Sequence, residues 1–103
     1  MARLRYTATA RDDLVSISRY IADQSGSRFV AERFAGRLRA KCREIAGSPI
    51  RLGRPRPDLA RDLRGLTIGN YMIFFRHVGD VVEIVNVIEG HRDIEALFRK
   101  DER

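Results

Sequence analysis

The sequence predicts an α+β fold with the element order β-α-α-β-β-β, in which an antiparallel helical hairpin packs on one face of a small, mainly antiparallel sheet. Two amphipathic helical patterns joined by a short turn fill the first half of the chain. The last third alternates β-branched and aromatic runs with glycine-containing turn dipeptides, as antiparallel strands do. At 103 residues the chain has the length of one domain, and we expect a single domain over residues 1–103.

The chain begins with a short strand that leads directly into the first helix. Leu4 and Tyr6 alternate with two arginines, which is typical of a half-buried strand. Thr7 or Thr9 then offers a hydroxyl to cap the start of a helix. The polar sequence Gln-Ser-Gly-Ser at residues 24–27 ends this helix with a turn.

Both predicted helices carry one apolar face, because apolar residues recur at steps of three and four. These residues are Ala10, Leu14, Ile17 and Ile21 in the first helix and Ala31, Phe34, Leu38, Cys42 and Ile45 in the second. The second helix ends at Gly47-Ser48-Pro49. The short connection predicts an antiparallel hairpin. The side chains expected to be buried against the sheet are Leu14, Ile17, Phe34 and Leu38.

Three strands are expected in the last third, over residues 63–68, 71–77 and 81–88, joined by the turns Gly69-Asn70 and Gly79-Asp80. The second and third strands are apolar on both faces. Simple alternation places Tyr71, Ile73 and Phe75 opposite Met72 and Phe74, and it places Val81, Val85 and Val87 opposite Val82, Ile84 and Ile88. The helical hairpin can cover one face only, and residues 94–98 are too few to cover all of the other.

Positive charge is the most pronounced bulk feature. The formal net charge is +6, and since Lys41 and Lys100 are the two lysines, the other eighteen basic residues are arginines. This charge indicates a polyanion or an acidic protein as the partner, with genomic composition bias as the alternative. The single cysteine, Cys42, excludes an intramolecular disulfide and is expected to be a core thiol.

The sequence favours a cytoplasmic protein with no membrane segment. Its N-terminus lacks the apolar stretch of a signal peptide. The longest apolar run, residues 71–75, is too short to cross a bilayer. No cluster of metal ligands is recognisable, and we expect no metal or other cofactor.

An extended loop is expected over residues 50–62, since Pro49, Pro55 and Pro57 resist regular structure. This loop holds the densest basic cluster, formed by Arg51, Arg54, Arg56 and Arg61 with Arg64 just beyond. These arginines either dock to nucleic acid or to a partner's carboxylates, or they form a solvated loop in which Asp58 and Asp62 pair with some of them.

Five motifs follow one another along nearly the whole chain. They are Ala10-x-x-Asp13-Leu14-x-x-Ile17-x-x-Tyr20-Ile21, Ala31-x-x-Phe34-x-x-x-Leu38-x-x-x-Cys42, Pro49-x-x-x-Gly53-Arg54-x-Arg56-x-Asp58-Leu59, the run from Gly69 to Arg76, and Val85-x-Val87-Ile88-x-Gly90-His91-Arg92-Asp93-Ile94. This ordered set resembles the RelE/ParE superfamily of toxins from type II toxin–antitoxin modules, and the ParE branch more closely. The resemblance implies a growth inhibitor that a cognate acidic, ParD-like antitoxin neutralises in a hetero-oligomeric complex.

The resemblance implies one of two activities. ParE-like members act on DNA gyrase, whereas RelE-like members cleave mRNA in the ribosomal A site. RelE-like nucleases end their last strand with Gly-Lys-Arg and place a tyrosine a short way beyond. The matching stretch here is Gly90-His91-Arg92, and the tyrosine position falls on Phe98, which has no proton to give. We therefore expect a gyrase-binding toxin without a catalytic site.

Two alternatives stay open. One is a ribosome-dependent mRNA endoribonuclease with His91 as acid or base and Arg92 on the phosphate, although Arg92 and Asp93 can instead pair to fix the C-terminal turn. The other is a toxin fold that has lost its toxicity. The expected contacts with a target or antitoxin are Arg51, Arg54, Arg56, Arg61, Arg64, Arg76 and Arg92. His77 is expected to be a surface residue.

Overall fold

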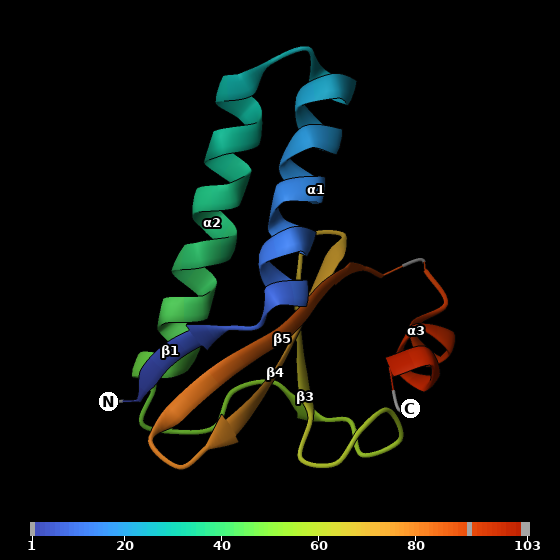
Figure 1. Cartoon of the computed structure of the whole chain (residues 1–103). Helices are drawn as coiled ribbons and strands as arrows, with labels where there is room; N and C mark the ends of the chain where they lie inside the picture. Colours follow the sequence, from blue (N-terminus) through green and yellow to red (C-terminus); the bar gives the residue numbers. More distant parts are fainter. Residues whose placement is uncertain (1, 91, 102–103) are drawn as a thin grey trace.

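The computed structural model describes residues 2–90 and 92–101 and has the predicted α+β fold (Figure 1). Its elements are β1 (Arg3–Tyr6), α1 (Ala8–Ser25), α2 (Arg28–Gly47), β2 (Arg54–Pro55), β3 (Arg64–Ile68), β4 (Tyr71–Val78), β5 (Val81–Glu89) and α3 (Ile94–Asp101). The sheet has the strand order β1-β5-β4-β3-β2. β1 runs parallel to β5, and every other neighbouring pair is antiparallel.

The helical hairpin begins and ends at residues that suit its caps. The Thr7 hydroxyl accepts a hydrogen bond from the Ala10 N–H at 3.0 Å, so Thr7 and not Thr9 is the N-cap of α1. Gly26 ends α1 with a φ of 69°, a left-handed conformation that glycine adopts without strain. Ser27 caps α2 through the Val30 N–H.

The apolar faces of α1 and α2 pack on one face of the sheet, as predicted. Leu14, Ile17 and Leu38 are buried there with Cys42, the expected core thiol. Phe34 is the exception. It is only partly buried, because it lies toward the free end of the hairpin, where its ring contacts Tyr71 at a centroid distance of 5.3 Å. The hairpin extends well beyond the sheet at the α1–α2 turn (Figure 1).

A bulge in β5 makes the predicted alternation of that strand wrong beyond Val85. Phe74 pairs with Asn86 and Phe75 with Ile84, so Val85 is an extra residue in β5. As a result Val87 shares the hairpin face with Val82 and Ile84, whereas Val85 and Ile88 lie on the opposite face. The alternation predicted for β4 is confirmed, with Tyr71, Ile73 and Phe75 toward the hairpin.

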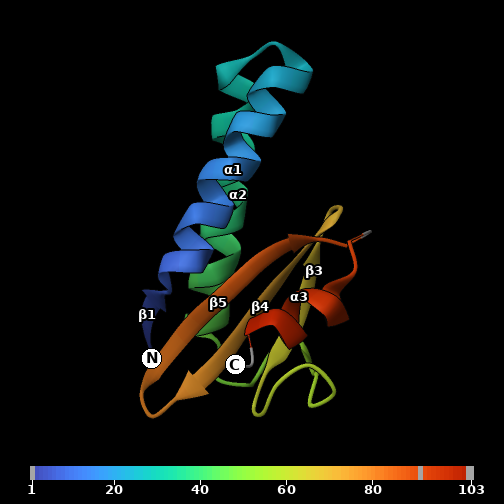
Figure 2. The same ribbon diagram turned by 45° about the vertical axis from the view of Figure 1, so that its right-hand side comes forward.

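The second face of the sheet is covered by α3 together with the loop before β3. Figure 2 shows α3 lying across β3 and β4. Phe98 of α3 and Leu59 and Leu63 of the loop form a second apolar cluster against Phe74 and Ile88. The expectation that the C-terminal segment cannot cover this face alone therefore agrees with the structure, which adds the loop as the second cover.

The loop predicted over residues 50–62 contains a short strand that the sequence analysis did not predict. β2 pairs with the first two residues of β3 and lies at the edge of the sheet. Gly53, directly before β2, has a φ of 77°, and a Cβ there would lie 2.7 Å from the Gly65 carbonyl oxygen. The close approach of the two backbones therefore requires glycine at this position. None of the helices described is long and apolar enough to cross a membrane.

Candidate functional site

Phe98, where the resemblance to RelE-like nucleases would place a tyrosine, is enclosed by packing. Phe98 is 6% exposed, and its ring meets Phe74 edge to face at a centroid distance of 5.1 Å. Leu59, Leu63 and Ile88 complete the surroundings. No described side chain of this cluster can act as a general acid or base.

The two other residues considered for catalysis, His91 and Arg92, follow β5 in the sequence. His91 falls outside the residues that the structure describes. Arg92 is exposed, and its backbone N–H donates to the Glu89 carbonyl at 3.1 Å. The expected pairing of Arg92 with Asp93 is not among the described ion pairs. Asp93 instead accepts a hydrogen bond from the Ala96 N–H at 3.1 Å and so caps the start of α3.

The basic cluster of the loop separates into arginines that hold the fold and arginines that face solvent. Arg64 belongs to the first kind. Its Nε donates to the Leu52 carbonyl at 2.9 Å, and its Nη2 donates to the carbonyls of Gly53 at 2.9 Å and Arg51 at 3.2 Å. Arg64 thereby fixes the three residues that precede β2, a structural role that the sequence did not reveal.

The remaining arginines of the loop differ in how free their charges are. Arg56 forms a two-pronged ion pair with Asp58, with nitrogen–oxygen distances of 3.0 and 3.1 Å. Arg61 is almost fully exposed and lies 3.9 Å from Asp62, a contact worth little in water. Arg51 and Arg54 are exposed, and no described carboxylate pairs with either. The expected pairing of Asp58 and Asp62 with loop arginines is therefore confirmed in part, and docking through the other arginines stays a prediction.

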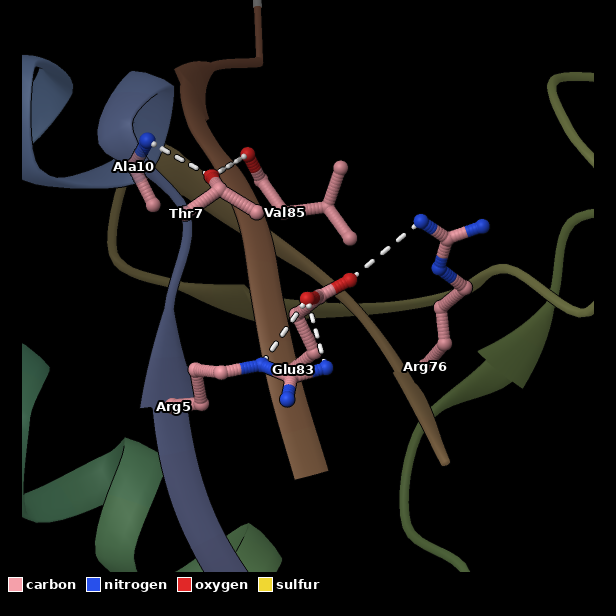
Figure 3. Close-up of polar contacts among 6 residues, drawn as sticks. All are labelled: Arg5, Thr7, Ala10, Arg76, Glu83 and Val85. Atoms are coloured by element: carbon pink, nitrogen blue, oxygen red, sulfur yellow. Dashed lines mark hydrogen bonds and ion pairs between the residues drawn. The ribbon is translucent and has the colours of Figure 1, made fainter. Parts of the chain in front are cut away.

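Arg76 lies apart from the loop, on the sheet face opposite the hairpin. One Glu83 carboxylate is shared between Arg76 of β4, at 3.2 Å, and Arg5 of β1, at 2.9 Å (Figure 3). The three residues are neighbours across three adjacent strands, because Arg5 pairs with Glu83 and Glu83 pairs with Arg76 in the sheet register. Two positive charges meet one negative charge, so this part of the face keeps a net positive charge.

An open pocket of about 410 Å³ lies where the loop meets the starts of β2 and β3 and the end of β4. It is lined by Arg51, Pro55, Pro57, Asp62, Leu63, Arg64 and His77. The expectation that His77 is a surface residue is wrong in part. His77 is half-buried, and its ring meets Phe75 edge to face at 5.9 Å. Burial, and then the charges of Arg51 and Arg64, lower the pKa of His77 below its usual 6.5.

The sequence did contain a signal for the position of His77. Alternation along β4 places it on the same face as Ile73 and Phe75, which are fully buried. The turn that follows at Gly79 suggested solvent, but the loop at residues 51–53 folds over this end of the strand. Among the described residues, no group of three or more His, Cys, Asp or Glu side chains is placed to hold a metal ion.

A family model and one relative both match this chain to ParE toxins. The model of the ParE toxin of the type II toxin–antitoxin system ParDE matches residues 4–94. Toxin ParE3 of Caulobacter vibrioides is 27% identical over 100 residues, which cover 97% of this chain and 98% of that protein.

Two solved structures have a similar fold. The chromosomal ParDE system from P. aeruginosa matches with a TM-score of 0.77 at 21% identity, over 86% of this chain and 96% of that chain. The toxin–antitoxin complex RelBE2 from Mycobacterium tuberculosis matches with a TM-score of 0.50 at 29% identity, over 85% and 96%.

Proposed function

The chain belongs to the ParE toxin family of type II toxin–antitoxin systems, and from this premise we propose that it stops growth by binding DNA gyrase, cleaves no RNA and is neutralised by a cognate acidic antitoxin. The observation that carries the proposal is the closed environment of Phe98. An RNA-cleaving toxin of this fold needs a proton donor where Phe98 packs against Phe74.

The exposed arginines of the loop are the proposed contact with gyrase. Arg51, Arg54 and Arg61 hold their charges in solvent, whereas Arg56 and Arg64 are engaged within the chain. Unpaired surface charges accelerate association with an oppositely charged partner and fix its orientation. Gyrase as the target rests on the resemblance to ParE-like toxins.

The antitoxin is proposed to cover the hairpin and to neutralise the basic surface. Four large apolar side chains of α1 and α2 are exposed, from 45% for Val30 to 66% for Phe29, with Val15 and Tyr20 between them. Exposed apolar groups of this size on a protein with a net charge of +6 suit an acidic segment that folds on binding.

The alternative function is a ribosome-dependent mRNA endoribonuclease. One observation favours it. Arg92 is exposed just beyond β5, where RelE-like nucleases resemble one another in holding an arginine. An arginine at this place would steady a phosphate, but it cannot supply the missing proton donor because the guanidinium stays protonated.

Two parallel assays on the full-length chain, purified away from its antitoxin, test the proposal. The first measures supercoiling of relaxed plasmid by gyrase, and the second measures cleavage of mRNA on programmed ribosomes. We expect inhibition of supercoiling and no cleavage, either from the natural chain or from His91→Ala and Phe98→Tyr. Cleavage that disappears with His91→Ala would replace the proposal by the ribonuclease alternative.

A charge-reversal pair tests whether the loop makes the contact. Arg54→Glu should weaken gyrase inhibition roughly tenfold, because an attractive charge becomes a repulsive one at the interface. Arg19→Glu on α1 introduces the same change of charge at another exposed position and serves as the matched control. If both variants lost gyrase inhibition equally, the loss would be due to the change in net charge, and the loop would not be part of the interface.

A further inference from the structure

The pocket beside β3 carries more positive charge than its own residues neutralise. Arg64 is held in place by three backbone carbonyls, which leave its charge uncompensated. Arg51 lines the same pocket and has no described ion-pair partner. Asp62 is the one carboxylate among the lining residues. Its described ion pair is with Arg61 at 3.9 Å, and both of these side chains are largely exposed to solvent.

His77 adds a polar atom that lacks a partner. Its Nε2 is buried and makes no hydrogen bond. Buried polar atoms are nearly always hydrogen-bonded, and His77 lines the pocket, so a ligand toward which the ring turns would give this nitrogen the partner that it lacks among the described residues. Two guanidinium groups and one imidazole thus surround the same space, and all three can donate hydrogen bonds.

The rest of the wall is apolar. Pro55, Pro57 and Leu63 line the pocket together with the charged groups. At about 410 Å³ the pocket is larger than one phosphate ion requires, so space remains beside the charged groups for a ring. A few convergent polar groups set in an apolar wall are typical of a small-molecule site.

We propose that this pocket binds the terminal phosphate of a small phosphorylated molecule, with Arg64 as a fixed positive charge, Arg51 as a second ligand from the loop and His77 as a hydrogen-bond donor. A terminal phosphate carries close to two negative charges near pH 7 and three acceptor oxygens, which matches donors on several sides. An internal phosphodiester carries one charge and is flanked by a sugar on each side, which keeps it from a buried nitrogen.

The proposal predicts a coupling between the ligand and the protonation of His77. In the free chain burial, and then the charges of Arg51 and Arg64, lower the pKa of His77. A bound phosphate dianion reverses the sign of the local potential and favours the protonated ring, so the pKa of His77 should rise on binding. The chain has two histidines, His77 and His91, so their ring signals can be followed separately.

The test is an NMR titration of the histidine rings in the full-length chain, with His77→Asn used to assign the signals. The probes are inorganic phosphate, a nucleoside 5′-monophosphate and a dinucleotide whose one phosphate is an internal diester. We expect saturable shifts of the His77 signal with the first two probes, at a Kd on the order of 1 mM, and none with the dinucleotide. A silent His77 signal with both inorganic phosphate and the nucleoside 5′-monophosphate, or equal binding of the dinucleotide, overturns the proposal.

Two charge-neutralising variants separate a built site from general attraction to a basic loop. Arg51→Gln should weaken phosphate binding by about tenfold, since it removes a charge-assisted hydrogen bond. Arg61→Gln removes the same charge from a side chain that is 96% exposed and does not line the pocket, so its affinity should stay within about twofold of the natural chain. Equal losses in both variants refute the site. Because neither gyrase nor ribosomes are present, failure here leaves the proposed function untouched.

Discussion

The carboxylate of Asp13 in α1 accepts a 2.9 Å hydrogen bond from the backbone N–H of Val87 in β5. β1 ends at Tyr6, opposite Ile84, so β5 has no strand beside it on that side from Val85 onward. Thr7 and Asp13 take the place of that strand, since the Thr7 hydroxyl donates to the Val85 carbonyl at 2.8 Å (Figure 3). The start of α1 thus satisfies backbone groups that a longer β1 would have bonded.

Replacing Asp13 should separate its role as an acceptor from its charge. Asp13→Ala leaves the Val87 N–H without its partner and should lower the free energy of unfolding by about 1–3 kcal/mol. Asp13→Asn keeps an acceptor oxygen and should lose much less. Urea denaturation of both variants measures the difference. Equal losses for the two would show that the hydrogen bond to Val87 does not account for the stability that Asp13 contributes.

Asp13 should also make the stability of the chain depend on pH. Burial raises the pKa of Asp13 above its usual 3.8, so the folded state disfavours the carboxylate. The resulting penalty is fully present above the raised pKa and disappears as the pH falls toward 3.8. The stability of the natural chain relative to Asp13→Asn should therefore improve on acidification through this range, and a constant difference would contradict the raised pKa.

His77 should have the opposite effect on stability at higher pH, because acidification there should destabilise the folded chain. Its pKa lies below 6.5 in the folded chain, so the unfolded chain binds the proton more readily. The contribution of neutral His77 to the free energy of unfolding is fully present above pH 6.5. It is lost as the pH falls from 6.5 to the lowered pKa. Thermal unfolding of the natural chain and of His77→Gln over this range should show the natural chain losing more stability. Parallel curves for the two proteins would count against the lowered pKa.

Two glycines should respond to alanine with opposite signs. Gly53→Ala places a Cβ 2.7 Å from the Gly65 carbonyl oxygen at a φ of 77°, so we expect a loss of about 1–3 kcal/mol and a detached β2. Gly36→Ala, within α2 and with open space around it, should stabilise the chain by about 0.5–1 kcal/mol. Thermal unfolding of the two variants measures these changes. An unchanged stability of Gly53→Ala would show that the approach of the Gly65 carbonyl does not require glycine at this position.

The two large apolar residues of α2 should differ in their contributions. Leu38 is 1% exposed, and Leu38→Ala should cost about 2–5 kcal/mol. Phe34 is partly buried near the end of the sheet, so Phe34→Ala should cost about 1–3 kcal/mol, below the range for a fully enclosed phenylalanine. Chemical denaturation of the two variants measures both losses. A larger loss for Phe34→Ala than for Leu38→Ala would show that Phe34 is more deeply buried against the sheet than the structure places it.

Much of the fold could be predicted because local patterns and tertiary structure agree. A threonine cap at the start of α1, both turns and the faces of residues 71–75 in β4 follow from spacing and residue type. The alternation of β5 failed because a single extra residue, Val85, reverses the faces beyond it, and no composition signal marks that bulge. Phe34 lies on the predicted helical stripe, but its burial depends on how far the hairpin extends past the sheet.

The candidate site was harder to predict because charge counts do not reveal partners. Five arginines fall close together in the sequence, and the structure gives them different roles. Arg64 binds backbone carbonyls, Arg56 binds Asp58, and Arg51, Arg54 and Arg61 face solvent. Those differences depend on where the loop folds over the sheet, which is a long-range property. His77 was missed for the same reason.

The parallel pairing of β1 with β5 has a consequence for synthesis. The first strand of the chain bonds to the last, and β5 lies between β1 and β4 in the sheet. A ribosome must therefore translate the chain through Ile84 before β1 has its whole partner, and through Val85 and Val87 before Thr7 and Asp13 have theirs. At about 5–20 residues per second, the helical hairpin, which ends at Gly47, is therefore synthesised seconds before the strand that joins β1 to the sheet.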